Sequence, residues 1–335
     1  MRIAVVGATG AVGQELLELL HERRFGFDAL SLYASNRSAG KGVEMGGQSY
    51  PVQALPEDGD LRSDLVFSSA GGGISRTYAW RWVEHGAVVI DNTSAWRMDE
   101  RVPLVVPEVN KEASLAHQGV IANPNCSTII ALMALAPLHR AFGLKRAVVA
   151  TYQAVSGAGA KGIAELEGQS HSLLHGSPSP PAAFAHPIAF NLFSHDSEVG
   201  ADGYNVEERK LLYESRKILA EPELALSCTA VRVPVFRAHS EAIHAQFSVW
   251  VRAEEVREVL QGAPGLRLVD DRAGNHFPMP IEAANQNEVL VGRVREDSAL
   301  PGGIALFVAG DQIRKGAALN ALQIAEFLTR RAPPG

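Results

Sequence analysis

The sequence of 335 residues holds only two cysteines, Cys126 and Cys228, which are too few for a disulfide framework. Lys and Arg number 31 against 37 Asp and Glu, so the chain has no basic surplus for nucleic acid or an anionic membrane. Its longest apolar stretch, Ile129–Leu138, is too short to cross a bilayer. Because a strand pattern starts at residue 2 without the features of a signal peptide, we expect a cytoplasmic protein.

The composition is typical of a folded chain with a large core. Hydrophobic residues make up 46% and charged residues 20% of the sequence, which excludes an intrinsically disordered protein. A length of 335 residues exceeds the size at which a single core usually stops growing. We therefore expect two lobes.

The N-terminus has the order strand, glycine turn, helix. Arg2–Val6 reads as a buried strand, the turn is Gly7-Ala-Thr-Gly-Ala-Val-Gly13, and a helix pattern begins at Gln14. Glycines let the backbone approach a pyrophosphate, and a helix N-terminus offers N–H donors for its charge. The spacing is G-x-x-G-x-x-G rather than G-x-G-x-x-G, and a tight turn without a ligand is the alternative.

The second strand, Leu30–Ala34, indicates which dinucleotide the chain binds. An acid at the end of this strand would bind the ribose 2′-hydroxyl of NAD, but the chain continues as Ser35-Asn-Arg-Ser38. A guanidinium and hydroxyls suit a 2′-phosphate, so we predict NADP. The alternative is that Arg37 is an ordinary solvated loop residue.

Strand and helix patterns alternate as far as Gly119–Ala122, which predicts a parallel sheet with helices on both faces. Longer strand patterns follow and predict a mixed or antiparallel sheet in a second lobe. Between them, Ser170–Gly203 is rich in Gly, Pro, His and Ser, and we interpret it as a long loop. An amphipathic pattern over Lys315–Leu328 predicts a closing helix that returns to the first lobe. The longer strand patterns are Arg146–Gln153, Thr229–Val235 and Ala242–Trp250.

Cys126 is the strongest candidate for a nucleophile. It stands in Asn123-Pro-Asn-Cys-Ser-Thr128, directly before the apolar helix pattern of Ile129–Leu135. A thiol in the first turn of a helix lies near the positive end of the macrodipole, which favours the thiolate. The alternative is a small buried hydrophobe, which explains Cys228 adequately. Pro137 should kink or end this helix near Ala136.

Five motifs in order along the whole chain resemble those of the bacterial aspartate-semialdehyde dehydrogenases. The resemblance implies reversible, NADP-dependent reduction of L-aspartyl-4-phosphate to L-aspartate 4-semialdehyde and phosphate, in the biosynthesis of lysine, threonine, methionine and diaminopimelate. It also implies a homodimer. The motifs are Gly7–Gly13, Asn123–Thr128, Tyr152–Gly159, Arg232–Glu241 and Lys315–Asn320.

The resemblance implies an α/β fold with two domains. The first is a Rossmann-type NADP-binding domain of residues 1–126, completed by the C-terminal helix within 312–335. The second, residues 127–311, is an α+β catalytic and dimerisation domain with a mixed sheet.

By the same resemblance, Cys126 would attack the acyl phosphate and form a thioester that accepts hydride from NADPH. His239 would act as acid and base, and Gln153 would orient the substrate carbonyl and the thiol. Ala238 precedes this histidine where many relatives have glycine, and we expect little consequence.

The resemblance also implies binding residues. Arg232 would clamp the substrate α-carboxylate, Glu207 would meet the amino group, and Arg97 and Lys210 would hold the phosphate. For Arg97 and Lys210 the alternative is a solvated face. The implied cofactor residues are Thr9, Gly10, Ala11 and Val12 for the pyrophosphate, Arg37 and Ser38 for the 2′-phosphate, and Ser156, Gly157 and Gln312 for the nicotinamide side.

Two alternatives to this function stay open. N-acetyl-γ-glutamyl-phosphate reductase shares the two-lobed plan and the cysteine, but a carboxylate at Glu207 would reject an amide nitrogen. A non-catalytic NADP-binding paralogue would be expected to lose the thiol or the imidazole, and this chain keeps both.

His171 and His175 have metal-ligand spacing without a third ligand at a recognisable interval, so we predict no metal.

Overall fold

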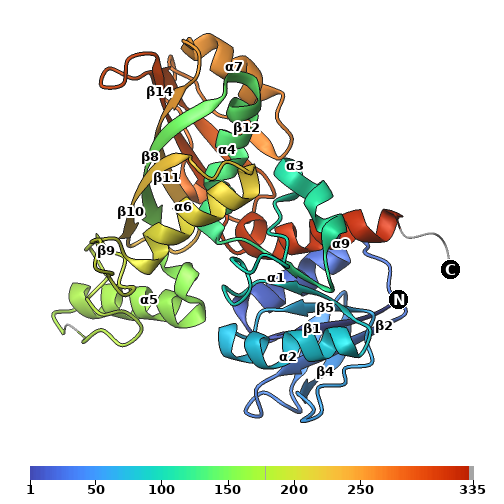
Figure 1. Cartoon of the computed structure of the whole chain (residues 1–335). Helices are drawn as coiled ribbons and strands as arrows, with labels where there is room; N and C mark the ends of the chain where they lie inside the picture. The colour runs from blue at the N-terminus through green and yellow to red at the C-terminus, as the bar shows by residue number, and fades with distance from the viewer. Residues whose placement is uncertain (178, 332–335) are drawn as a thin grey trace. The chain divides into compact units, whose positions relative to one another are not determined.

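A computed structural model describes residues 1–177 and 179–331 of the chain. The chain divides into two compact units, which Figure 1 shows coloured by residue number. Unit 1 comprises Met1–Asn125 together with the segment from Ala317 onward, and unit 2 comprises Cys126–Gly316. Within the described residues, no helix has both the length and the apolar character needed to span a membrane.

Unit 1 is built on a seven-stranded sheet in the order β3-β4-β2-β1-β5-β6-β7. All neighbouring strands pair parallel, except that β3 and β4 form an antiparallel hairpin. The predicted parallel sheet is therefore confirmed, with this hairpin as an addition at its edge. The strands are β1 (Arg2–Val6), β2 (Ala29–Ala34), β3 (Gly42–Met45), β4 (Gln48–Ala54), β5 (Leu65–Ser68), β6 (Val88–Asp91) and β7 (Val120–Ala122).

Helices cover the sheet of unit 1. Helix α1 places Leu16 and Leu20 on the side chains of β1, and Leu322 of α9 joins the same buried cluster. The Arg23 guanidinium donates two hydrogen bonds of 2.7 Å to the carboxylate of Glu326, which ties α1 to α9. The helices are α1 (Ala11–Glu22), α2 (Gly72–Glu84), α3 (Pro107–Asn110), the 3₁₀ helix η1 (Lys111–Ala116) and α9 (Leu319–Arg331).

Unit 2 is built on a mixed seven-stranded sheet in the order β12-β13-β14-β11-β8-β10-β9. Strands β8 and β10 pair parallel, as do β12 and β13, and the other neighbours are antiparallel. This arrangement confirms the predicted mixed sheet. The strands are β8 (Leu144–Gln153), β9 (Phe193–Ser194), β10 (Ala225–Arg232), β11 (His239–Phe247), β12 (Leu266–Leu268), β13 (Val289–Glu296) and β14 (Gly303–Gly310).

Helices α4 and α6 contact each other and lie against the sheet of unit 2 (Figure 1). Helix α4 is buried over most of its length, in keeping with a sequence that is apolar all round. The helices of this unit are α4 (Cys126–Phe142), the 3₁₀ helix η2 (Val155–Ala158), α5 (Ala160–Leu174), α6 (Val206–Leu219), α7 (Ala253–Gln261) and α8 (Pro280–Ala283). The π-helical turn η3 (Arg314–Ala318) begins in unit 2 and ends in unit 1.

Several predicted boundaries differ from the structure. Helix α4 continues through Pro137 to Phe142, so of the two predicted effects of Pro137, a kink or an end, the end near Ala136 is wrong. The burial of its apolar side chains outweighs the roughly 3 kcal/mol that an interior proline costs. The tract predicted as a loop over Ser170–Gly203 begins inside α5, which ends at Leu174. The closing helix starts with the π turn η3, and residues 332–335 of the predicted first domain lie outside the described residues.

The ends of two strands in unit 2 also differ. Strand β10 stops at Arg232 instead of Val235, because the Val235 N–H bonds the Val233 carbonyl in a tight turn around Pro234. Strand β11 ends at Phe247 instead of Trp250, after a register shift that follows Gln246. The first change makes Arg232 the last residue of β10, and β11 begins at His239 rather than at the predicted Ala242.

Candidate active site

Three neighbouring strands of unit 2 bring predicted site residues to one edge of the sheet. Gln153 and Arg232 are the last residues of the parallel strands β8 and β10 and lie directly opposite each other. His239 is the first residue of β11, which runs antiparallel to β8. Because the carboxyl ends of β8 and β10 meet the amino end of β11 at one edge, these three side chains share one site.

Cys126 is the first residue of the 17-residue helix α4, and its side chain is half-buried. The chain packs tightly around it: a Cβ atom on Gly316 would lie 2.9 Å from the Cys126 Cβ. Only glycine fits at Gly316 without moving the cysteine. A negative charge on Cys126 would raise the pKa of the Arg232 guanidinium, so the two side chains lie within electrostatic range of each other.

Gln153 is buried and connects the start of α4 with α6. Its Nε2 donates to the Oγ of Ser127 at 2.8 Å and to the Oε1 of Glu207 at 3.3 Å. Glu207 lies in the first turn of α6, and its Oε2 accepts a hydrogen bond of 2.8 Å from the Lys210 Nζ, one turn further on. The amide thereby positions the residue next to Cys126 and a buried carboxylate.

A single peptide group holds the histidine and the arginine of the site. The Ala154 N–H donates to the Nδ1 of His239 at 3.0 Å. The Ala154 carbonyl accepts a hydrogen bond of 2.9 Å from the Nη1 of Arg232. A Cβ atom on Gly157 would lie 3.1 Å from Arg232 Nη1 and 3.3 Å from His239 Cε1, so this glycine keeps open the space next to both groups.

His239 is fully buried, and this burial, followed by the charge of Arg232, lowers the pKa of its imidazole to about 3. The ring is therefore neutral at pH 7. Because Nδ1 accepts the Ala154 N–H, the ring proton lies on Nε2. Within the part of the chain that the structure describes, Nε2 has no hydrogen-bond partner. His239 is thus prepared to donate a hydrogen bond.

The guanidinium of Arg232 is buried, and this burial lowers its pKa. It lies over the ring of Phe184, with 5.4 Å from Cζ to the ring centroid, and its Nη2 bonds the Nε2 of His195 at 2.9 Å. Its Nε has no partner among the described residues. A buried, unpaired donor on a cation indicates a place for an anionic ligand group. The sequence prediction missed His195, which lies in a tract without a periodic pattern.

Ser156 and Gln312 lie together in unit 2. The side chain of Gln312 donates to the Ser156 hydroxyl and accepts a 2.9 Å hydrogen bond from the Ala238 N–H. Ala238 has a φ of 72°, a conformation that glycine adopts far more readily than alanine. The expectation that alanine has little consequence here is therefore wrong for the backbone, because alanine is sterically strained in this conformation.

The glycine turn of unit 1 connects β1 to α1 as predicted. Gly7 has a φ of 92°, and a Cβ atom there would lie 2.8 Å from the Ser69 Oγ. A Cβ on Gly13 would lie 2.3 Å from the Gly7 carbonyl oxygen, so α1 packs directly on the turn. Gly10 is the N-cap, and no described side chain caps the helix. The first N–H groups of α1, at Ala11 and Val12, next to the turn residue Thr9, therefore suit an anion.

The remaining predicted residues of unit 1 lie in two loops. Arg37 and Ser38 belong to the turn after β2, where the Ser38 N–H bonds the Ser35 carbonyl at 2.8 Å and Arg37 is exposed. Arg97 is buried, which excludes the solvated-face alternative for it. Its guanidinium donates to the carbonyl oxygens of Asn123 and Asn92 at 2.9 and 3.0 Å.

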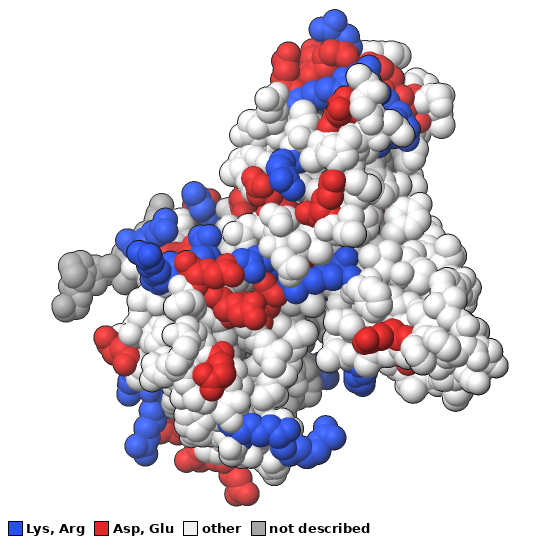
Figure 2. Space-filling model, turned by 180° about the vertical axis from the view of Figure 1, so that it is seen from behind, with Lys and Arg blue, Asp and Glu red and all other residues white. Residues whose placement is uncertain are grey.

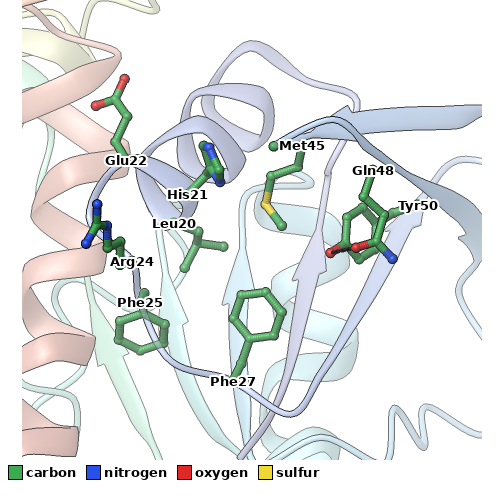
Figure 3. A pocket seen from close by; sticks show the side chains of 10 residues that line it. Leu20, His21, Glu22, Arg24, Phe25, Phe27, Met45, Gln48 and Tyr50 are labelled. Carbon is green, nitrogen blue, oxygen red and sulfur yellow. Dashed lines mark hydrogen bonds between the residues drawn. The ribbon is translucent and has the colours of Figure 1, made fainter.

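A pocket of about 600 Å³ in unit 1 contains none of the predicted site residues. Figure 3 shows it between the end of α1, the loop that follows and the β3–β4 hairpin, with Phe25, Phe27, Met45 and Tyr50 around it.

Burial raises the pKa of the Cys228 thiol in unit 2, which makes this thiol unreactive. Among the described residues, no group of three His, Cys, Asp or Glu side chains could hold a metal ion.

Comparisons with known proteins define the class first. The family model "Semialdehyde dehydrogenase, NAD binding domain" matches residues 2–117, and "Semialdehyde dehydrogenase, dimerisation domain" matches residues 135–315. The two matches cover most of the chain and define a semialdehyde dehydrogenase with a dinucleotide-binding domain.

The relatives define the family more narrowly. The aspartate-semialdehyde dehydrogenase of Synechocystis sp. is 50% identical over 99% of this chain and 98% of its own length. The structure of aspartate semialdehyde dehydrogenase II from Vibrio cholerae complexed with ASA has a TM-score of 0.95 at 44% identity, with 99% of each chain covered. The Candida albicans enzyme with NADP has a TM-score of 0.74 at 26% identity, with 98% of each chain covered. The chain belongs to the aspartate-semialdehyde dehydrogenase family.

Proposed function

We propose that this chain catalyses the reversible, NADP-dependent reductive dephosphorylation of L-aspartyl-4-phosphate to L-aspartate 4-semialdehyde and phosphate. One observation carries the proposal: the Ala154 peptide holds a neutral imidazole and a buried guanidinium side by side, both next to Gly157. A carboxylate-binding cation and a proton donor beside a cysteine suit an acyl phosphate that also bears an amino-acid head group. The names of the relatives support the same assignment.

Cys126 is the proposed nucleophile. Its position at the N-terminus of α4 and the nearby charge of Arg232 favour a thiolate. Attack of the thiolate on the acyl carbon forms a C–S bond, breaks the C–O bond to phosphate and leaves a thioester. NADPH, when bound, supplies the hydride that reduces the thioester to the aldehyde, and the thiolate is the second leaving group.

His239 is proposed to act through Nε2, which carries the ring proton. In this tautomer it donates a hydrogen bond to the carbonyl oxygen while negative charge develops there. Accepting the thiol proton at the same nitrogen would need the ring proton on Nδ1, and the Ala154 N–H opposes that tautomer. We therefore favour the donor role of His239 over the base role. Gln153 is proposed to orient the carbonyl.

Two side chains of opposite charge are proposed to bind the substrate head group. Arg232 would bind the α-carboxylate, for which its unpaired Nε is a donor. Glu207 would accept from the ammonium group. An N-acetylated substrate presents a neutral amide there, which a carboxylate attracts less than an ammonium group, so the aspartyl substrate is favoured over N-acetyl-γ-glutamyl phosphate. Arg97 and Lys210 are proposed to bind the phosphate.

NADP is the proposed cofactor, and the residues present fit it. The backbone at Gly7 and Gly10, which carries no side chains, and the helix start from Ala11 would bind the pyrophosphate. The exposed guanidinium of Arg37 is available to a 2′-phosphate. Ser156, Gly157 and Gln312 would contact the nicotinamide side. Accordingly, residues 1–126 with 312–335 are proposed as the NADP-binding domain and 127–311 as the catalytic domain.

A homodimer is proposed, in which unit 2 supplies the interface. The match to a dimerisation domain supports it, as does the surface around α5, where Figure 2 shows few charged side chains. The cytoplasmic location stays a prediction. Large exposed apolar side chains of unit 2 include Leu173, Leu174, Phe190, Leu192, Val199 and Tyr204.

The test is a steady-state assay of purified protein with L-aspartate 4-semialdehyde, phosphate and NADP, run beside N-acetyl-L-glutamate 5-semialdehyde. Activity on the aspartate compound alone supports the proposal. Activity on the N-acetylated compound alone would assign the chain to the reductase alternative. Activity on neither would indicate the non-catalytic paralogue.

A further inference from the structure

His195 forms a bridge between the two residues that the proposed function assigns to the substrate head group. Its Nε2 lies 2.9 Å from the Arg232 Nη2. Its Nδ1 lies 3.1 Å from the Ser197 Oγ, and the same hydroxyl accepts the Glu207 N–H at 3.2 Å. One ring therefore connects the end of β10 to the first turn of α6.

The tautomer of His195 follows from its partners. A guanidinium can only donate, so the His195 Nε2 accepts from Arg232. A neutral imidazole keeps one proton, which must then lie on Nδ1 and is donated to the Ser197 Oγ. The 3.3 Å approach of the Ser197 N–H to Nδ1 is then not a hydrogen bond, since both would be donors. The hydrogen-bond path runs from Arg232 through His195 to Ser197.

The backbone around His195 is ordered by its neighbours. The His195 N–H donates to the Ala230 carbonyl at 2.8 Å, next to the short antiparallel pairing of β9 with β10. The His195 carbonyl accepts from the side chain of Asn205, the N-cap of α6, at 3.4 Å. The ring is thus fixed relative to both elements that it connects.

The charges that face His195 come from three elements. Arg232 of β10 and Lys210 of α6 disfavour its protonated form, while Glu207 of α6 and its chain neighbour Asp196 favour it. Burial is the largest influence, and the pKa of His195 lies below its ordinary value. Protonation would place a second cation against the Arg232 guanidinium and remove the acceptor that holds it.

We propose that His195 is a positioning residue for substrate recognition: its neutral ring holds Arg232 and the start of α6 in the geometry that reads the α-carboxylate and the ammonium group together. The proposal rests on the proposed function, because it assigns the substrate groups as given there. His195 touches no reacting atom. Its loss should therefore weaken substrate binding and leave the chemical step nearly unchanged.

The kinetic test compares the wild type with His195→Phe and His195→Gln. The Phe variant keeps a ring without nitrogen atoms, and we expect the KM for L-aspartate 4-semialdehyde to rise about tenfold or more, because a hydrogen bond to a charged group is lost. The kcat and the KM for NADP should change less than about twofold. Glutamine can accept from Arg232, so His195→Gln should recover most of this loss. His276→Phe, an exposed histidine of the same unit, is the control.

A fall in kcat with an unchanged substrate KM, or a Gln variant as impaired as the Phe variant, would overturn the proposal. The pH dependence is a second readout: the substrate KM of the wild type should rise at low pH as His195 takes a proton, and this rise should disappear in His195→Gln.

A measurement without substrate separates this proposal from the proposed function. Long-range ¹H–¹⁵N NMR of the ¹⁵N-histidine-labelled full chain, with His195→Gln to assign the signal, should show the neutral Nδ1–H tautomer for His195 at pH 8. The Nε2–H tautomer would overturn the bridge, whatever reaction the protein catalyses. Correct NMR signals without turnover of the aspartate compound would instead overturn the proposed function.

Discussion

The main-chain N–H of Ala154 donates to the Nδ1 of His239 at 3.0 Å, and this one contact fixes how the imidazole can act. The ring proton lies on Nε2, and burial keeps the ring neutral. The backbone of unit 2 thus determines the tautomer before any substrate binds.

Replacing His239 with asparagine should remove this donor and keep the fold. The Asn Oδ1 can accept the Ala154 N–H, so no buried backbone group is left without a partner. We expect kcat to fall by about 10²–10⁴-fold, while the melting temperature changes little. Steady-state kinetics and thermal unfolding measure the two effects; a kcat within about twofold of the wild type would contradict the assignment.

Gly157→Ala should lower activity without unfolding the protein. Its Cβ would lie 3.1 Å from Arg232 Nη1 and 3.3 Å from His239 Cε1, so both groups must shift by a few tenths of an ångström. We expect a loss in kcat/KM of about tenfold or more, because small displacements of reacting groups are costly. Gly168→Ala in α5 is the matched control, since its Cβ meets nothing within 4 Å; an equal loss there would contradict the role of Gly157.

Gly13→Ala should destabilise unit 1 and weaken NADP binding. Its Cβ would lie 2.3 Å from the Gly7 carbonyl oxygen and 2.8 Å from the Ala8 Cα, and backbone atoms cannot rotate away. We expect a loss of about 1–3 kcal/mol in the free energy of unfolding. Urea unfolding checks this value, and Gly26→Ala, where a Cβ meets nothing within 4 Å, should leave it unchanged within about 0.5 kcal/mol.

Arg37→Glu should weaken NADPH far more than NADH. The new carboxylate would repel the 2′-phosphate, which only NADPH carries. Fluorescence titration gives both dissociation constants, and Arg24→Glu provides the same charge change elsewhere in unit 1. Equal losses for the two cofactors in Arg37→Glu would mean that this residue does not bind the 2′-phosphate.

Glu241→Gln should stabilise the protein as pH rises. Glu241 is fully buried, neither carboxyl oxygen has a partner among the described residues, and burial raises its pKa well above the usual range. The folded chain therefore keeps a proton that the unfolded chain releases above about pH 4.5, so wild-type stability falls with pH by up to about 1.4 kcal/mol per unit. Unfolding at pH 4.5 and 8 should show the variant more stable only at pH 8. A pH-independent difference would mean that Glu241 is ionised in the folded state.

Several parts of the fold could be read from the sequence because local patterns and chain order determine them. The strand, glycine turn and helix from Arg2 to Glu22 follow from periodicity and from the glycines. The pairing of Gln153 with Arg232 did not follow from the sequence, which predicted that the second strand continues to Val235. The continuation of α4 through Pro137 did not follow, because tertiary burial overrides the local penalty.

Other features depend on contacts that no local pattern shows. His195 reaches Arg232 from an irregular tract, so neither spacing nor propensity identifies it. The positive φ of Ala238 is a backbone property that the residue type alanine does not indicate. The tautomer of His239 depends on the direction of one peptide N–H. In each case the signal is three-dimensional, and only the structure provides it.

The central claim, a thioester at Cys126, can be tested by a single-turnover experiment without phosphate. Mixing the enzyme with NADP and L-aspartate 4-semialdehyde should release about one equivalent of NADPH per chain, and intact-mass spectrometry should find an aspartyl group on Cys126; added phosphate should then start steady turnover. Cys126→Ser should show neither. Steady NADPH formation without phosphate, or a full burst in Cys126→Ser, would contradict the account.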